Sequence, residues 1–270
     1  MRALPCCVPP SLKSKSEDGA SGQGTLESNE CHVWWARPSL GPFSFPLLEE
    51  SLSPTELHQA ARFRFPKDRL AYIFRHGVLR SILGCYLGIK PGEVCFSIHP
   101  GGKPQLQPAS NPLDLRFNLS RTEDMALFAM TRGREVGVDV ERLQPLPDWE
   151  SVAQVALSRR ELEVLSSLPE AERMVAFFRG WTRKEAMLKA LGDGIGAGTS
   201  HLDVNLADSD NTGITGFSEF RLNGSTSSPW SLFDLLPVPG FAGAVAIRAS
   251  GLRLVCRPWL ECGNTAAAII

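Results

Sequence analysis

The stretch WTRKEAMLKALGDG, residues 181–194, joins the end of a long helical pattern to a run of glycines. After Pro169, the sequence EAERMVAFFRGWTRKEAMLKAL predicts a single long helix. Its last turns carry Lys184, Glu185 and Lys189, of which the last two are i,i+4 neighbours and suit a surface ion pair worth about 0.3–0.5 kcal/mol. The following GDGIGAG run contains far more glycine than a helix C-cap requires, which suits a mobile loop or a close approach to a ligand. A solvated helix face and a ligand-binding face are both open interpretations.

Working outward from this helix, strands and a second long helix are predicted. The strict alternation of REVGVDVER predicts a strand upstream, and further strands are expected in CHVWWARPSL, EVCFSIHPGGKPQL, LRFNLS and DMALFAMTR. A long helix is expected from about Lys67 to Leu87, and a strand in GFAGAVAIRA. Strands and a long helix occur before and after about residue 137. This order predicts an α+β fold of two similar α/β lobes in a pseudo-twofold arrangement, each with a small, mainly antiparallel sheet and a long helix.

The same pattern sets the expected boundaries. Residues 1–29 are rich in Ser, Gly and charge, which predicts a disordered leader. The N-terminal lobe is expected over residues 30–137, the C-terminal lobe over 138–250, and a C-terminal tail over 251–270.

Two helix starts carry capping signals. Ser53 precedes Pro54 and is followed by Glu56, and Ser158 is followed by Glu161, so that both fit a capping box. The helix over 67–87 is expected to bury Leu70, Ile73, Phe74, Val78, Ile82 and Leu83, with Arg62, Arg64, Arg69, Arg75 and Arg80 on other faces.

Composition excludes several classes of function. The 270 residues can bury a full core, and a formal charge of -1 does not supply the dense basic face that nucleic-acid binding needs. The seven cysteines include no CxxC pair, and no window approaches the ~18 continuous apolar residues of a membrane-spanning helix. We therefore expect a cytoplasmic protein that binds neither nucleic acid nor membrane. A monomer is expected, because two packed lobes bury between them what a smaller protein would bury by oligomerising.

The motif GVDVE, residues 137–141, places two carboxylates on one side of its strand. Period-two geometry sends Val138 and Val140 to the core and Asp139 with Glu141 to the opposite face, roughly 7 Å apart. Two neighbouring carboxylates repel unless a cation lies between them, and Mg²⁺ prefers such oxygen ligands. An ordinary half-buried strand has the same alternation, so this alternative is also open.

The GGKP turn, residues 101–104, combines backbone donors with a lysine, which suits phosphate. Downstream, LRFNLSRT adds the hydroxyl of Ser120 and the guanidinium of Arg121. A solvated turn lysine and a solvated surface arginine are the alternative interpretations.

Taken in order, LSPTELHQAARF, LRSIL, GGKP, FNLSRT, VGVDVE and RGWTRKEAMLKALGDG resemble the 4'-phosphopantetheinyl transferase family, in its larger two-lobed type. The resemblance runs from about Val33 to Ala249, and its specific part is GVDVE followed about forty residues later by WTRKEAMLKALGDG. It implies transfer of phosphopantetheine from coenzyme A to a serine of an apo acyl or peptidyl carrier protein, with release of adenosine 3',5'-bisphosphate.

The resemblance also implies roles for single residues. Asp139, Glu141 and Glu185 would hold Mg²⁺ on the pyrophosphate of coenzyme A. Lys189 would pair with a phosphate oxygen, and Glu185 is also a candidate base for the carrier serine, so that these two would carry the catalysis. The other implied contacts to coenzyme A are Gly102, Lys103, Pro104, Ser120 and Arg121.

Two departures from the family pattern bear on coenzyme binding. Arg121 stands where the family commonly has His, and arginine can bind phosphate through two donors. Glu56 and Gln59 stand near the places where some relatives hold the 3'-phosphate with basic residues, and Arg69, in preference to Arg62, is expected to replace them. A catalytically weak coenzyme A or carrier-protein binding module of the same fold is the alternative hypothesis. A metal-dependent phosphohydrolase is disfavoured, because the His and Asp clusters of such sites are missing.

Overall fold

The computed structural model describes residues 25–40, 43–99, 101–192, 202–204, 206, 221–222, 225–226, 230–235 and 237–260. Most of the leader expected over residues 1–29 lies outside these ranges, as does the glycine run after Gly192. Residues 25–29, the last part of this predicted leader, are described, and Leu26 among them is buried in the core.

The first sheet has four strands in the order β12-β1-β5-β4. They are β1 (Glu30–Ala36), β4 (Leu115–Thr122), β5 (Met125–Arg132) and β12 (Arg253–Pro258). β5 is antiparallel to both of its neighbours, whereas β12 runs parallel to β1. β12 lies in the segment 251–270, for which the sequence predicts a tail; the chain instead returns to the first sheet.

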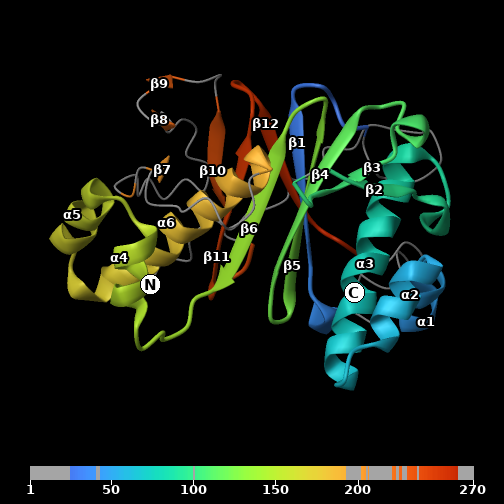
Figure 1. Ribbon diagram of the computed structural model, residues 1–270, viewed down its shortest axis with the longest axis horizontal. Helices are drawn as coiled ribbons and strands as arrows, with labels where there is room; N and C mark the ends of the chain where they lie inside the picture. The colour runs from blue at the N-terminus through green and yellow to red at the C-terminus, as the bar shows by residue number, and fades with distance from the viewer. Residues whose placement is uncertain are drawn as a thin grey trace, which may run out of the picture.

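The second sheet has three antiparallel strands in the order β10-β11-β6. They are β6 (Val136–Arg142), β10 (Ser231–Leu235) and β11 (Phe241–Ile247). The long helix α6 (Glu170–Leu191) packs across β6 and β11, and α4 (Trp149–Ala156) and α5 (Arg159–Ser167) pack against α6 (Figure 1).

The other long helix, α3 (Pro66–Leu87), covers the outer face of the first sheet together with two short helices (Figure 1). The remaining elements are α1 (Phe45–Glu50), α2 (Pro54–Ala61), β2 (Phe96–Ile98), β3 (Pro104–Leu106), β7 (Leu202–Asp203), β8 (Arg221–Leu222), β9 (Ser225–Thr226) and single 3₁₀ turns at Pro38–Leu40, Pro91–Glu93 and Pro108–Ser110.

The two sheets pack face to face over a shared apolar core. Val33 and Leu127 from the first sheet meet Val138, Val140 and Val245 from the second. The expectation that the valines of GVDVE face the core is therefore confirmed, and the acids between them face the other way. The layers follow the order helix, sheet, sheet, helix, which is a mixed α+β fold with small, mainly antiparallel sheets (Figure 1).

The predicted helix starts are confirmed. Ser53 with Glu56 and Ser158 with Glu161 both form complete capping boxes, in which each serine accepts from the glutamate amide and each glutamate accepts from the serine amide. α1 is not predicted from the sequence, because its six residues make less than two helical turns and are too few to show a helical period.

Two expectations about α3 are wrong. Arg80 is buried, not on an outer face, because it pairs with Glu56 and donates to the carbonyl oxygens of Pro91 and Val94. Leu70 is 41% exposed although its spacing places it on the predicted buried stripe. Leu70 is not among the described residues of the core that α3 forms with the first sheet, whereas Ile73 and Phe74, about one turn further on, are.

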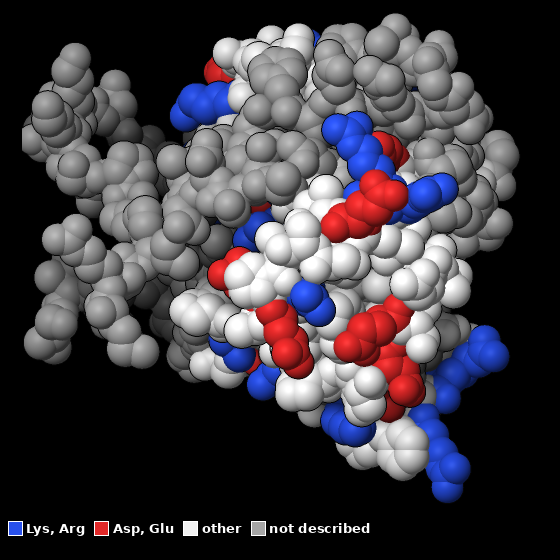
Figure 2. Space-filling model, turned by 90° about the vertical axis from the view of Figure 1, so that its left-hand side faces the viewer, with Lys and Arg blue, Asp and Glu red and all other residues white. Residues whose placement is uncertain are grey.

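The surface of the described residues shows no gathering of one charge sign on the face that carries α4 and α5. Lys and Arg side chains are interspersed there with Asp and Glu (Figure 2). Among the described residues, no helix combines the length and the apolar character needed to cross a membrane.

Candidate active site

Gly137 sets the distance between β6 and α6. A Cβ at this position would overlap the carbonyl oxygen of Ala186 and would lie 2.9 Å from the carbonyl carbon of Lys189. Only glycine therefore lets the backbone of the helix come this close to the strand. Because strand residues alternate between faces, Asp139 and Glu141 are presented to α6 on the same side as Gly137.

Asp139 is buried at 3% exposure and accepts hydrogen bonds from two polar side chains. Its Oδ1 accepts hydrogen bonds from Nζ of Lys189 at 2.6 Å and from Oγ of Ser120 at 2.8 Å. The same ammonium donates to Oγ of Ser120 at 2.9 Å. Oδ2 is buried and, within the described chain, has no hydrogen-bond partner. A buried carboxylate oxygen without a donor is unfavourable, so it marks a place where a cation or a further donor fits.

Glu141 and Glu185 complete a group of three acids. The pKa of Glu141 is raised to about 7, first by burial and then by the charge of Asp139, against the opposing effects of Lys189 and a hydrogen bond from Trp181. Glu185 is buried too, and its pKa is raised by burial and then by Asp139, while Lys189 opposes the shift. The three carboxylates thus lie within the electrostatic reach of one ammonium.

No three His, Cys, Asp or Glu side chains within the described ranges are arranged to hold a metal ion. The donor chemistry nevertheless fits Mg²⁺, because the charge of Asp139 acts on both Glu141 and Glu185 and because the buried oxygen Oδ2 of Asp139 has no donor among the described residues. The metal-ligand roles of Asp139, Glu141 and Glu185 stay a prediction, and Lys189 is the cation that the structure places against them.

Lys184 is a structural residue and not part of a solvated face. It is 1% exposed, its Nζ lies 2.5 Å from Oε2 of Glu161, and it donates to the carbonyl oxygen of Ala156 at 3.0 Å. Glu161 belongs to the capping box of α5. This buried pair therefore fixes α4 and α5 against α6, and with them the orientation of Glu185 one residue further on.

β4 sends its side chains alternately towards β6 and towards α3. Oδ1 of Asn118 accepts the backbone N–H of Val138 at 2.9 Å, and Ser120 bonds to Asp139 as described. Arg121 follows Ser120 and so belongs to the α3 side. There the pKa of Arg75 is lowered to about 10, first by burial and then by the charge of Arg121. Two guanidinium groups held near each other favour an anion between them.

Arg69, the residue expected at the 3'-phosphate, lies in the first turns of α3 and pairs with Glu49 of α1. Arg75 is the residue that the fold brings to Arg121. From the sequence alone, Arg75 has no role beyond being one of the arginines near α3, because Arg121 lies 46 positions away on another element. Trp181, to which the sequence motifs assign no role, also reaches the site through its hydrogen bond to Glu141.

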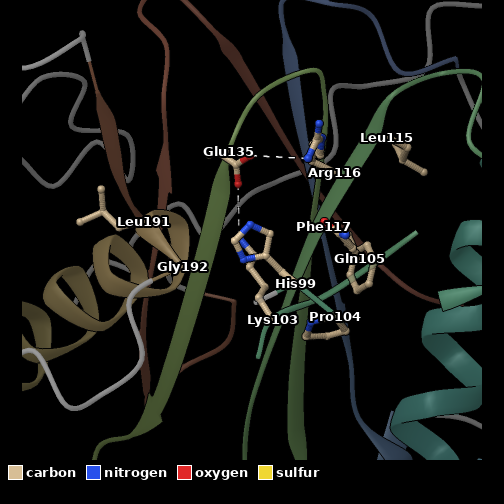
Figure 3. A pocket seen from close by; sticks show the side chains of 10 residues that line it. All are labelled: His99, Lys103, Pro104, Gln105, Leu115, Arg116, Phe117, Glu135, Leu191 and Gly192. Carbon is tan, nitrogen blue, oxygen red and sulfur yellow. Dashed lines mark ion pairs between the residues drawn. The ribbon is translucent and has the colours of Figure 1, made fainter. Parts of the chain in front are cut away.

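The GGKP turn lines a cavity of about 260 Å³ beside the C-terminal end of α6. Lys103 donates to the carbonyl oxygen of Val136 at 2.8 Å and lies 3.8 Å from Glu135, which stands between Lys103 and Arg116 (Figure 3). Burial lowers the pKa of Lys103, and Glu135 acts in the opposite direction. Gly102 has φ +83, a conformation that favours glycine. Pro104, Leu191 and Gly192 line the same cavity.

Comparison of the sequence with known proteins points to a family. Residues 135–246 match the model of the 4'-phosphopantetheinyl transferase superfamily. The 4'-phosphopantetheinyl transferase HetI of Nostoc sp. is 38% identical over 227 residues, which are 84% of this chain and 91% of that protein.

Two further relatives are more distant. The L-aminoadipate-semialdehyde dehydrogenase-phosphopantetheinyl transferase of Homo sapiens is 26% identical over 69% of this chain and 62% of its own length. The 4'-phosphopantetheinyl transferase psf-1 of Bacillus pumilus is 28% identical over 55% of this chain and 61% of its own length. The resemblance found in the sequence is confirmed, and the chain belongs to the 4'-phosphopantetheinyl transferase superfamily.

Proposed function

We propose that this protein transfers the 4'-phosphopantetheine group from coenzyme A to a serine hydroxyl of an apo acyl or peptidyl carrier protein and releases adenosine 3',5'-bisphosphate. One observation carries the proposal for this chain. Asp139 pairs with Lys189, has one buried oxygen without a donor among the described residues, and lies close enough to Glu141 and Glu185 to raise the pKa of both. Such a mixture of acids and an ammonium suits a substrate that brings both a cation and phosphate.

The transfer is a substitution at the phosphorus nearer to pantetheine. The serine oxygen forms a bond to this phosphorus, the bond to the bridging oxygen breaks, and the bisphosphate leaves with the electron pair. The hydroxyl proton needs an acceptor, for which Glu185 is the candidate, directly or through a water molecule. Burial raises the pKa of its carboxyl group above the ordinary value, which makes it a better base than an exposed glutamate.

Asp139, Glu141 and Glu185 would hold Mg²⁺, with Oδ2 of Asp139 as the buried oxygen that has no donor among the described residues. When bound, the metal would polarise the pyrophosphate and neutralise part of its charge. Glu185 then has two candidate roles, as ligand and as base, and we rank its role as ligand first, because one carboxylate cannot easily do both jobs at once.

Basic side chains at three places would bind the rest of coenzyme A. Lys189 would pair with a phosphate oxygen and offset charge on the leaving bisphosphate. Lys103, with Gly102 and Pro104, would contact the nucleotide at the cavity beside the end of α6, and Ser120 would add a hydroxyl contact. For the 3'-phosphate we propose Arg121 with Arg75, in place of Arg69. Arg121 and Arg75 are close enough for their charges to interact, whereas Arg69 pairs with Glu49.

The partner would be an apo acyl or peptidyl carrier domain that brings its serine to this site. We further propose that the protein acts as a monomer in the cytoplasm, without nucleic acid or membrane, and that its two lobes divide at about residue 137 in a pseudo-twofold arrangement. Similar elements on both sides of that residue support the division: α3 packs on the first sheet as α6 packs on the second.

One assay tests the proposal against the alternative of a catalytically weak binding module. The protein is incubated with apo acyl and peptidyl carrier proteins, coenzyme A and Mg²⁺, and the carrier is weighed by mass spectrometry. A carrier that gains the mass of phosphopantetheine supports the transferase. If several carriers bind but none gains this mass, the binding module is the better account.

A further inference from the structure

The ammonium of Lys189 lies against one of the acids that we propose as metal ligands. Its Nζ is 2.6 Å from Oδ1 of Asp139, and its charge opposes the raised pKa values of both Glu141 and Glu185. In the described structure it is therefore the positive neighbour of all three acids. The bond is not a surface pair, because the side chain of Asp139 is only 5% exposed.

This contact compensates for the burial of the Asp139 carboxylate when no metal is bound. An ionised carboxylate without a partner is costly to bury, and removing one member of a buried pair is strongly destabilising. Lys189 and Ser120 satisfy Oδ1 of Asp139, so the strand and the helix can pack before any cation arrives. Oδ2 of Asp139 has no hydrogen-bond donor among the described residues, so this compensation is incomplete.

Lys189 can leave this position without disturbing the helix. It belongs to the last turn of α6, two residues before the end of the helix at Leu191, and its side chain is 28% exposed. Lys184, one and a half turns earlier, is 1% exposed and locked to Glu161. The two lysines of the same helix thus differ in freedom, and the more exposed one is the one that faces the acids.

We infer that Lys189 is the resident counter-ion of the acidic site in the metal-free protein, and that a divalent cation must displace it from Asp139 in order to bind. This inference rests on the proposed function. Two cations at one carboxylate repel each other, so the metal binds weakly while Lys189 stays. The pyrophosphate of coenzyme A offers Lys189 a new anionic partner, which frees Asp139 for the metal. The protein therefore binds the metal tightly only together with coenzyme A.

The test measures metal affinity in the absence of coenzyme A. Mn²⁺ serves as the probe, and its free concentration is followed by electron paramagnetic resonance during titration of the full-length protein. Lys189→Met should bind Mn²⁺ about tenfold or more tightly than the wild type, which corresponds to a coupling of about 1.4 kcal/mol. Arg142→Met is the matched control. It removes a positive charge next to Glu141 that pairs with Glu123 instead of Asp139, and should change the affinity by less than about threefold.

Equal or weaker Mn²⁺ binding by Lys189→Met overturns the inference, as does an equal gain in Arg142→Met, which would show a general charge effect. If Lys189→Met does not fold, Lys189→Gln keeps two N–H donors for Asp139 and Ser120 without the charge. Its melting temperature should then rise more with added MgCl₂ than that of the wild type, because a ligand stabilises the state that binds it better. No such difference contradicts the inference.

Wild-type transfer, measured separately by mass spectrometry, keeps this test distinct from that of the proposed function. If the wild type carries out the transfer and the Mn²⁺ affinity of the lysine variants is unchanged, only the counter-ion role of Lys189 is refuted. If those variants bind Mn²⁺ more tightly but the wild type modifies no carrier, only the proposed transferase function is refuted.

Discussion

Gly137 of β6 lies so close to α6 that a β-carbon on it would overlap the carbonyl oxygen of Ala186. The two backbones touch at the one place in the strand where no side chain intervenes. This contact is what brings the last turns of α6, with Glu185 and Lys189, to the acids of β6.

We predict that Gly137→Ala separates the helix from the strand. The added methyl group must push α6 outward, and overpacking of this kind typically lowers the free energy of unfolding by about 1–3 kcal/mol. Lys189 then no longer reaches Asp139. Urea unfolding measures the loss, and the transfer assay should show a fall of at least about tenfold.

Gly92→Ala is the control for this substitution. A Cβ there would meet only the carbonyl oxygen of Ser51, at the ordinary contact distance of 3.8 Å. Stability and transfer should stay near the wild type. If Gly137→Ala behaves in the same way as Gly92→Ala, the close approach has no functional importance.

The buried pair of Lys184 and Glu161 gives a second prediction. Lys184→Met leaves Glu161 buried without its partner and should lower the free energy of unfolding by about 3–5 kcal/mol. Adding Glu161→Gln should restore part of the loss, since no unpaired charge is then buried. Arg159→Met breaks an exposed pair with Glu163 and should cost less than about 1 kcal/mol. Similar losses in both single variants would contradict a structural role for Lys184.

Glu56 predicts a dependence of stability on pH. Burial alone would raise its pKa, but hydrogen bonds from His76 and Ser53 and the charge of Arg80 lower it from 4.5 to about 2. Because the folded value is the lower one, Glu56 stabilises the protein above pH 4.5 and loses this effect as the pH falls towards 2.

The wild type should therefore lose about 2 kcal/mol more than Glu56→Gln between pH 5 and pH 3, as measured by urea unfolding at each pH. Glu163→Gln, at an exposed position, should follow the wild type at every pH. Parallel curves for the wild type and Glu56→Gln would show that the network around Glu56 does not hold its carboxylate.

The two arginines on the α3 side give a prediction about coenzyme binding. Arg121→Ala and Arg75→Ala should each raise KM for coenzyme A about tenfold or more, the usual loss for a hydrogen bond to a charged group. Both should leave KM for 3'-dephospho-coenzyme A nearly unchanged. Arg69→Ala, which loses only its pair with Glu49, should behave as the wild type with both substrates. Equal effects of all three variants would place the 3'-phosphate elsewhere.

Local patterns in the sequence predicted the elements well, because capping and periodicity are properties of neighbouring residues. The capping boxes at Ser53 and Ser158 and the alternation of GVDVE are of this kind. The pattern failed where packing against a distant element decides the outcome. Arg80 is buried because the 3₁₀ turn at Pro91–Glu93 and Val94, which directly follows it, supply carbonyl acceptors that the helical period of α3 does not reveal.

The site was predictable to a similar extent. The three acids and Lys189 follow from motifs, yet their mutual contacts depend on the packing of α6 on β6. Lys184 and Lys189 look alike in the sequence, and only the fold separates a lysine buried against Glu161 from one that meets Asp139. The approach of Arg75 to Arg121 and the return of β12 to β1 join segments far apart in the chain, which one sequence without relatives does not show.

The most direct measurement is the mass of the carrier protein after incubation with coenzyme A, Mg²⁺ and either Glu185→Gln or Glu163→Gln. Both substitutions remove one helical carboxylate, but Glu185 is buried beside Asp139 and Glu163 is exposed beside Arg159. Our account predicts that Glu163→Gln modifies the carrier at the wild-type rate, and that Glu185→Gln, while folded, is slower by roughly 10²-fold or more. A rate for Glu185→Gln within about twofold of the wild type, less than 1 kcal/mol of barrier, would contradict the central claim that this acid takes part in the transfer, as metal ligand or as base.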